Sequence, residues 1–275
     1  MVSFEIAIFL DKYSGHLFHD VELYIICYDL IVKSLNSDLL SLKASNIYFI
    51  NKPDMLHEKF NRNVNINSYL CKKLFNCKNF KIISFKDFNP IKYDIIVDRF
   101  QQPKKGINKA FANYILGFPN NYWYNSLKLS KPSIDTFKIL YTSRQNTGRK
   151  LTDKSHNILC ELIKKYNGTI INDLGEYSIE EQIKIFQSHN CVIGVHGNNL
   201  TGIMWMCPKS YIFEILPFKV KNSVYDYHCM SLCMNHQYTQ INCQGNSHNG
   251  VFNFNEDDIN YMKHTFHMLY SIYNN

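Results

Sequence analysis

The sequence lacks the features that most readily assign a chain to a metal-binding, membrane or fibrous class. It contains no Cys-x-x-Cys pair, and neither Cys71 nor Cys77 has a histidine nearby, so the spacing of a structural zinc site is absent. The first residues carry neither a basic segment nor a long apolar core, which argues against a signal peptide or a membrane anchor. There is no low-complexity segment and no internal repeat. We therefore expect a folded cytoplasmic chain without a membrane span.

Disulfide bonds are not expected either, although the sequence contains 9 cysteines. An odd number of cysteines without a signal peptide favours reduced thiols in a reducing compartment. Five of them lie in apolar stretches: Cys27, Cys160, Cys191, Cys229 and Cys233. We expect these thiols to be buried.

Positive charge is what the sequence has in excess, with a formal net charge of +7 and a pI near 8.8. Its lysines are scattered, with short clusters at residues 72–73, 104–105 and 164–165. A solvated basic surface accounts for this charge, and so does a cleft that attracts a diphosphate or a polyanion. No basic helix or aromatic RNA-binding signature accompanies it, so a nucleic-acid partner rests on net charge alone and is not expected.

The hydrophobic pattern predicts an α/β protein with parallel sheets. The chain has 275 residues, 45% of them hydrophobic, which suits one large domain or two small ones. Short β-branched or aromatic runs alternate with helical patterns, as is typical of parallel strands flanked by helices. In the first half, helical spacing covers residues 19–35 and about 58–74, and strand patterns cover residues 46–51, 80–85 and 93–100.

The alternation is cleaner in the second half of the chain. The predicted strands are residues 137–143, 169–173, 191–195, 211–216 and 237–242. The predicted helices are residues 153–166, 178–189, 199–206, 224–234 and 255–273. Asp153 is the expected N-cap of the first of these helices. Ser178 and Glu181 form a Ser-x-x-Glu capping box at the start of the second.

A segment rich in Pro, Asn and Ser at residues 117–136 is the best candidate for a linker. We therefore expect two Rossmann-like lobes with a cleft between them. In this prediction residues 1–135 form the N-terminal lobe, residues 136–255 the C-terminal lobe and residues 256–275 a closing helix. Whether that helix crosses back to the first lobe stays open.

A strand, a tight turn and a helix meet at residues 191–206, where His196, Gly197, Asn198 and Asn199 separate two apolar runs. Such a junction directs backbone N–H groups and the positive end of a helix toward an anion. Gly197 lets the main chain approach closely or adopt a positive φ. His196 follows its strand at the C-terminal end, where open parallel sheets bind ligands. On these residues alone, a purely structural junction and a phosphate-binding site are about equally supported interpretations.

Charged residues of the same lobe favour the phosphate site. The strand at 137–143 leads into a loop with Ser143, Arg144 and Arg149, whose guanidinium groups can clamp a diphosphate in a bidentate manner. Glu214 follows in a later strand, where a carboxylate at the C-terminal end can accept two ribose hydroxyls. Taken singly, each arginine is also explained as a solvated loop residue, and Glu214 as a strand carboxylate facing water.

Together, residues 139–153, 177–217 and 225–242 resemble the C-terminal half of family 61 glycosyltransferases. The hallmark of that family is a strand, then His-Gly-Ala and a variable residue, then Leu, a short helix, Pro and a strand bearing Glu. This chain has Asn198 where the family usually has Ala, and Asn199 at the variable place. The departure puts a polar side chain at the turn, so the sugar choice or even the activity can differ.

The first half is similar to the family over a shorter stretch. Residues 13–24 resemble the family's His-Asp segment, which begins a helix after a loop containing Gly or Asn. His19 and Asp20 align with that His-Asp pair, and His16 precedes them. The resemblance covers most of residues 13–35 and 137–245, and no motif aligns between residues 50 and 136.

The resemblance implies a GT-B-like fold and an inverting transfer from a nucleotide sugar, usually UDP-linked, to a glycan or a glycoprotein acceptor. The sugar would be of the xylose or N-acetylglucosamine type. The implied donor site consists of Ser143, Arg144, Arg149, His196, Gly197, Asn198, Asn199, Leu200, Thr201 and Glu214. The UDP-sugar is a co-substrate, and no cofactor is expected. Because members of the family often work in the secretory lumen, that compartment applies if the chain is a fragment of a longer protein.

An inverting transfer needs a base that takes the proton of the attacking hydroxyl, and positive charge that stabilises the departing diphosphate. Enzymes that use a metal for the second task commonly carry Asp-x-Asp, and this chain has none. We therefore expect a metal-independent reaction, with Arg144 and the His-Gly turn at the diphosphate. The resemblance points to Asp20 in the other lobe as the base, with His19 second. A carboxylate that only favours the start of a helix is the alternative for Asp20.

Two points stay open at the level of sequence. Residues 225–228 either line the donor pocket or belong to a plain amphipathic helix. The chain is also compatible with a catalytically degenerate module of the same fold that binds a nucleotide or a glycan without turnover, which Asn198 and the short first lobe favour. Donor hydrolysis separates the two, since a working transferase usually leaks sugar to water. The sequence gives no prediction of the oligomeric state.

Overall fold

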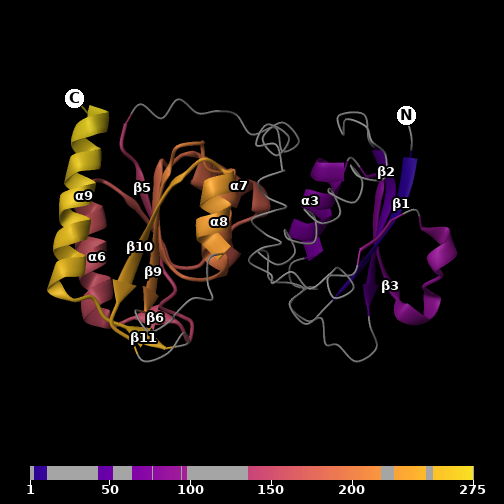
Figure 1. Cartoon of the computed structure of the whole chain (residues 1–275), viewed down its shortest axis with the longest axis horizontal. Helices are drawn as coiled ribbons and strands as arrows, with labels where there is room; N and C mark the ends of the chain where they lie inside the picture. The colour runs from indigo at the N-terminus through magenta and orange to yellow at the C-terminus, as the bar shows by residue number, and fades with distance from the viewer. Residues whose placement is uncertain are drawn as a thin grey trace. The chain divides into compact units, whose positions relative to one another are not determined.

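The structure is a computed structural model that describes residues 3–10, 43–51, 64–75, 77–93, 95–97, 136–217, 226–245 and 250–274. By its internal contacts the chain divides into two compact units, Met1–Lys128 and Leu129–Asn275. Each unit contains its own parallel sheet (Figure 1). The predicted α/β architecture of two lobes with parallel sheets is therefore confirmed.

The first unit is built on a four-stranded parallel sheet with the order β3-β2-β1-β4. The strands are β1 (Ser3–Phe9), β2 (Lys43–Asn51), β3 (Asn79–Ser84) and β4 (Ile95–Val97). Helix α3 (Val64–Phe75) packs against β2 and β3, and the 3-10 turns η2 (Phe85–Asp87) and η3 (Pro90–Lys92) follow β3. The central strands bury Ile6, Ile8, Ile47 and Phe49 completely, so the apolar runs of the sequence form this core.

The three strands predicted in this unit correspond to β2, β3 and β4, and the described part of the second predicted helix is α3. Strand β1 was not assigned from the sequence, although its apolar run is typical of a central strand buried on both faces. The helix predicted at residues 19–35 lies outside the described residues.

The second unit contains a five-stranded parallel sheet with the order β10-β9-β8-β5-β7. Its strands are β5 (Ile139–Thr142), β7 (Thr169–Ile171), β8 (Cys191–Val195), β9 (Tyr211–Pro217) and β10 (Gln237–Cys243). All five were predicted from the sequence. A short parallel pair, β6 (Lys150–Leu151) with β11 (Val251–Phe252), was not, because two-residue strands leave no periodic pattern.

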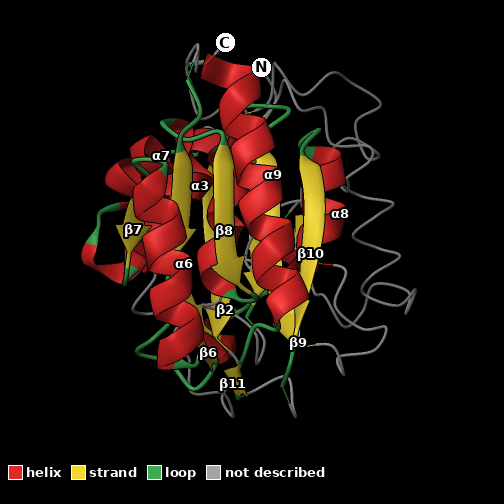
Figure 2. Ribbon diagram, turned by 90° about the vertical axis from the view of Figure 1, so that its left-hand side faces the viewer, coloured by secondary structure: helices red, strands yellow, loops and turns green. Residues whose placement is uncertain are grey.

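Helices cover both faces of this second sheet (Figures 1 and 2). Helices α6 (Asp153–Lys165) and α9 (Glu256–Asn274) lie on one face. Helix α7 (Ile179–Gln187), the 3-10 helix η5 (Asn198–Trp205) and helix α8 (Asp226–Cys233) lie on the other, and the 3-10 turn η4 (Leu174–Glu176) precedes α7. The result is a three-layer α/β unit.

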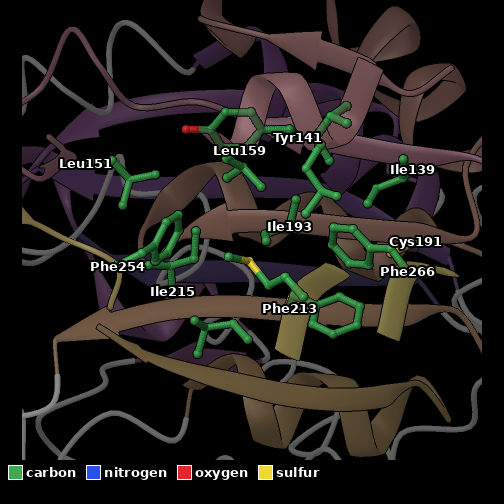
Figure 3. Close-up of a cluster of buried hydrophobic side chains, with 14 of the residues drawn as sticks. Ile139, Tyr141, Leu151, Leu159, Cys191, Ile193, Phe213, Ile215, Phe254 and Phe266 are labelled. Carbon is green, nitrogen blue, oxygen red and sulfur yellow. The ribbon is translucent and has the colours of Figure 1, made fainter. Parts of the chain in front are cut away.

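The largest described core of this unit lies between the sheet and the α6–α9 layer (Figure 3). Ile193 and Phe213 of the central strands meet Leu159 of α6 and Phe266 of α9 there, and each is at most 2% exposed. Burying one such side chain stabilises the fold by about 1.5–3 kcal/mol. The closing helix therefore packs on the core of its own unit, which is where its apolar residues Met262, Phe266 and Leu269 are buried.

Local capping signals explain where two of these helices begin. The capping box of α7 is confirmed, because Ser178 Oγ accepts from the N–H of Glu181 and the Glu181 carboxylate accepts from the N–H of Ser178. Asp153, predicted as the N-cap of α6, is its first helical residue instead. Thr152 is the N-cap, because its hydroxyl accepts from the N–H of Ser155 and is itself held by Asn253.

Six cysteines whose side chains are described are free thiols, Cys71, Cys77, Cys160, Cys191, Cys207 and Cys243. Cys191 is fully buried as predicted, whereas Cys160 is half-buried. Cys27 and the side chains of Cys229 and Cys233 lie outside the described residues. Among the helices that the structure describes, none combines the length and the apolar character that a membrane crossing requires.

Candidate functional site

The structure brings together two segments that follow neighbouring strands of the second sheet. The arginine loop (residues 143–150) follows β5, and the His-Gly turn (residues 195–200) follows β8, which pairs with β5. Arg149 Nη1 donates a hydrogen bond to the carbonyl oxygen of His196 at 2.8 Å. Asn199 Nδ2 donates to the carbonyl oxygen of Ser143 at 3.2 Å. Residues that the sequence separates by about fifty positions therefore form one site at the carboxyl ends of two parallel strands, where α/β folds bind ligands.

Gly197 is required by the geometry of this site. Its φ of +148° lies in a region that L side chains rarely adopt. A Cβ atom at this position would also lie 2.0 Å from Arg144 Nη1 and 2.6 Å from Arg144 Cζ. The absent side chain thus lets the Arg144 guanidinium lie directly against the main chain of the turn.

Two guanidinium groups share this site and are partly withdrawn from water. Burial lowers the pKa of Arg144 from its usual value. The pKa of Arg149 is lowered by burial and further by the positive charge of Arg144. Arg144 Nε is buried and finds no hydrogen-bond partner within the described ranges. A bound anion would offset both the desolvation and the mutual repulsion of these cations.

The carboxylate in this region is already engaged by the protein. Glu214 Oε1 is hydrogen-bonded to Nδ1 of His196, and Glu214 Oε2 accepts from the hydroxyl of Tyr238 at 2.5 Å. Glu214 is 0% exposed and His196 is 6% exposed. The alternative interpretation of Glu214, as a strand carboxylate that faces water, is therefore wrong. Accepting ribose hydroxyls stays an untested prediction for Glu214, and both of its oxygens already have partners in the protein.

An aromatic ring packs against the imidazole of His196. The ring of Tyr227 meets it edge-on, with the ring centroids 5.3 Å apart. Tyr227 is 3% exposed, and this burial raises the pKa of its hydroxyl far above the usual value. Of the four residues 225–228, Tyr227 thus lines the site from helix α8, whereas Tyr225 lies outside the described residues.

The remaining predicted donor residues serve mainly to build the turn. Leu200 and Thr201 are fully buried, and the N–H of Leu200 donates to the carbonyl oxygen of Gly197 at 2.9 Å. The hydroxyl of Thr201 donates to Asn198 Oδ1 at 3.5 Å. Ser143 is also buried, and its N–H donates to the carbonyl oxygen of Ile171 at 2.8 Å. These contacts hold the arginine loop and the His-Gly turn in shape.

Sequence reasoning did not find two residues of the site. Tyr238 lies in β10 and reaches Glu214 because β10 pairs with β9. The sequence pattern of either strand alone does not indicate that the two strands are neighbours. Thr142 is 1% exposed, and its buried hydroxyl has no hydrogen-bond partner within the described ranges. It lies next to Gly194, where an added Cβ would approach Thr142 Oγ1 to 2.5 Å. A polar residue ending the buried run of β5 is the signal that could have indicated Thr142.

The residues expected to provide the base, Asp20 and His19, lie outside the described residues, as does His16. Their roles stay predictions. No group of three or more His, Cys, Asp or Glu side chains that could hold a metal ion occurs within the described ranges. The metal independence expected from the sequence is likewise untested.

The chain matches the sequence model of one known protein family over more than half of its length. The sequence model of the family described as Glycosyltransferase 61 matches residues 14–213, which is more than half of the chain. A search of curated proteins finds no match. Among solved structures, the chain is similar to a glycosyl transferase family 9 from Veillonella parvula DSM 2008, with a TM-score of 0.42 and 9% sequence identity, covering 86% of each chain.

Proposed function

The chain belongs to the glycosyltransferase 61 family and is a glycosyltransferase, and on that premise we propose that it is an inverting enzyme that uses a UDP-sugar without a metal ion. The sugar is of the xylose or N-acetylglucosamine type, and the acceptor is a hydroxyl of a glycan or of a protein-linked glycan. The diphosphate of the donor binds between the arginine loop and the His-Gly turn.

The observation that carries this proposal is the pair of partly buried arginines. Arg144 and Arg149 are close enough for their charges to disfavour each other, and burial disfavours both. The Glu214 carboxylate, which favours the charge of Arg149, is bonded to His196 and Tyr238. Two cations held in this way at the ends of parallel strands match the charge of a diphosphate.

The same groups account for the chemistry of the departing donor. The acceptor oxygen forms a bond to the anomeric carbon, while the bond from that carbon to the diphosphate oxygen breaks on the opposite face. Negative charge then develops on the UDP oxygen, where the guanidinium groups and the main chain of the turn stabilise it. The acceptor's proton passes to a base, for which the family resemblance indicates Asp20.

Binding of UDP to Arg144 variants tests the proposed site. Arg144→Ala should weaken UDP binding by about 1.5–3 kcal/mol, the usual contribution of a hydrogen bond to a charged group. Arg144→Lys should recover only part of this loss, because an ammonium lacks the planar fork of donors. Calorimetric titration measures both affinities, with Lys164→Ala on the exposed face of α6 as the control cation. Unchanged affinity in Arg144→Ala would remove this residue from the site.

A degenerate module that binds UDP without turnover is the second candidate, and Asn198 is the residue that favours it. Its side-chain oxygen accepts from Thr201, so the polar group that replaces the usual Ala is used at least partly within the turn. This contact is compatible with an intact donor site. Slow release of free sugar from a bound UDP-sugar would identify a working enzyme, and its absence alongside tight UDP binding would identify the degenerate module.

A further inference from the structure

A continuous line of hydrogen bonds crosses the second sheet toward the arginine loop. Tyr238 lies in β10, Glu214 in β9, His196 directly after β8, and Arg149 after β5. These strands are neighbours in the order β10-β9-β8-β5 (Figure 2 shows β10, β9 and β8). Each residue bonds to the next, from the Tyr238 hydroxyl through the Glu214 carboxylate and the His196 side chain and carbonyl to Arg149 Nη1. We call this series the four-strand relay.

The burial of Glu214 decides how its partners are protonated. A carboxylate that is 0% exposed is tolerated only if hydrogen bonds replace the lost water. An ionised carboxylate is an acceptor only, so both partners must donate to it. Tyr238 donates through its hydroxyl, and His196 therefore carries a proton on Nδ1. Glu214 thus fixes both the tautomer and the orientation of the imidazole.

The main chain of the same histidine continues the relay. The N–H of His196 donates to the carbonyl oxygen of Ile215 at 3.0 Å, which ties the turn to β9 beside Glu214. The carbonyl oxygen of His196 accepts from Arg149 Nη1 at 2.8 Å. A shift of the His196 backbone therefore changes the position of one of the two arginines, and the side-chain bond to Glu214 helps to hold that residue in place.

Tyr238 is itself held in place by a second ring. The imidazole of His228 in α8 stacks on it, with centroids 4.8 Å apart and planes inclined by 20°. Such stacking restricts the rotation of the phenol and keeps its hydroxyl directed at Glu214. The far end of the relay is thus anchored to both β10 and α8.

We propose that Glu214 and Tyr238 are positioning residues that hold His196 in its Nδ1–H form and, through the His196 carbonyl, place Arg149 for the donor diphosphate. This inference rests on the proposed function, because the diphosphate is the ligand that Arg149 serves. It assigns to Glu214 a role in orienting the site in place of direct contact with the ribose. Partners of this kind commonly change ligand affinity about tenfold or more when they are removed from metal sites, and the same physical effect applies here.

Two isosteric variants test the relay, each with a matched control. Glu214→Gln replaces an acceptor by a carboxamide that can accept or donate, so His196 is no longer restricted to one tautomer. Tyr238→Phe removes the donor to Oε2 and keeps the ring. Glu161→Gln, on the exposed face of α6, and Tyr166→Phe, a buried tyrosine on the opposite face of the sheet, are the controls. Thermal unfolding confirms that all four proteins remain folded.

Two measurements read out different parts of the inference. Nitrogen NMR of the histidine rings reports which ring nitrogen of His196 is protonated, and the signal is assigned by its loss in His196→Gln. Calorimetry measures affinity for UDP and for inorganic pyrophosphate. We expect wild-type His196 to carry its proton on Nδ1 and Glu214→Gln to show both tautomers. We also expect UDP affinity to fall about tenfold in Glu214→Gln and about threefold in Tyr238→Phe, with both controls unchanged.

The outcomes separate this inference from the proposed function. The positioning role is overturned if both relay variants bind UDP as tightly as the wild type does. It is also overturned if His196 of the wild-type protein carries no proton on Nδ1. The proposed function stands in either case. If the wild-type protein binds neither UDP nor pyrophosphate, the proposed function fails and the placement of Arg149 for a diphosphate fails with it. The NMR result then still decides whether Glu214 fixes the tautomer of His196.

Discussion

At the scale of single residues, Gly197 determines how closely Arg144 approaches the His-Gly turn. Gly197→Ala should move the guanidinium, since the new Cβ would lie 2.0 Å from Arg144 Nη1. We expect a loss of UDP affinity similar to that of Arg144→Ala. The unfavourable φ of +148° should also lower the free energy of unfolding by about 1–3 kcal/mol.

The same loop provides the control for this prediction. Gly148 lies in the arginine loop, and a Cβ added there meets no atom within 4 Å. Gly148→Ala should therefore leave UDP affinity and stability near the wild-type values. Calorimetry and urea unfolding of the two variants compare the sites directly. If Gly197→Ala binds UDP as the wild type does, the contact between Arg144 and the turn does not matter for the ligand.

At the scale of secondary-structure elements, His236 joins the beginning of β10 to η5. Its Nε2 donates to the carbonyl oxygen of Ile203 at 3.0 Å. Burial lowers the pKa of His236 from 6.5 to about 4, and the bond to Ile203 opposes this only in part. The unfolded chain therefore binds a proton more readily than the folded one, so stability is full above pH 6.5 and is lost as pH falls toward 4.

Urea unfolding at several pH values tests this contribution. The shift corresponds to a loss of up to about 3 kcal/mol over that range. His236→Gln keeps a donor for Ile203 but does not titrate, so its free energy of unfolding should fall less on acidification. Carboxylates and other histidines titrate equally in both proteins and cancel in the comparison. Equal losses in the two proteins would show that His236 does not cause the acid sensitivity.

The elements of the second unit could be predicted because local and tertiary preferences agree in them. The apolar runs of β8 and β9 suit only buried strands, and Ser178 with Glu181 specifies the start of α7 by contacts within four residues. The N-cap of α6 was predicted one residue late because Asn253, 101 positions away, helps to hold Thr152. Sequence spacing contains no information about such a partner.

The site was predictable to a similar depth. The turn after β8 and the arginines after β5 are visible as polar interruptions of apolar runs, and the structure brings them together through the pairing of β5 with β8. The contact between Glu214 and Tyr238 was not predictable, because it depends on β10 lying beside β9. Tyr238 and Glu214 are therefore side by side for a reason of topology, and strand patterns specify faces of a sheet but not the order of its strands.

At the scale of the whole molecule, charge stabilisation of the leaving group should come from the protein and not from a metal ion. No Asp-x-Asp is present in the sequence, whereas Arg144 and Arg149 lie together at the site. We expect transfer activity to persist in excess EDTA. Product formation with and without chelator is the measurement. Complete loss of activity that manganese restores would show that a metal ion takes part.

The last prediction concerns the separate roles of the two units in donor binding and in proton removal. The proposed donor site lies in the second unit, and the family resemblance indicates a base, Asp20, in the first. A base acts only as the acceptor's proton leaves, so Asp20→Asn should lower kcat by about 10²–10⁴-fold while UDP affinity stays near the wild-type value. If Asp20 only favours the start of a helix, asparagine should serve nearly as well and the rate should barely change.

Two variants, Asp20→Asn and His19→Ala, decide between these roles. The measurements are the initial transfer rate at saturating donor and the affinity for UDP. A near-normal rate for Asp20→Asn with a collapsed rate for His19→Ala would assign the base to the histidine, and normal rates for both would direct the search to residues 50–136.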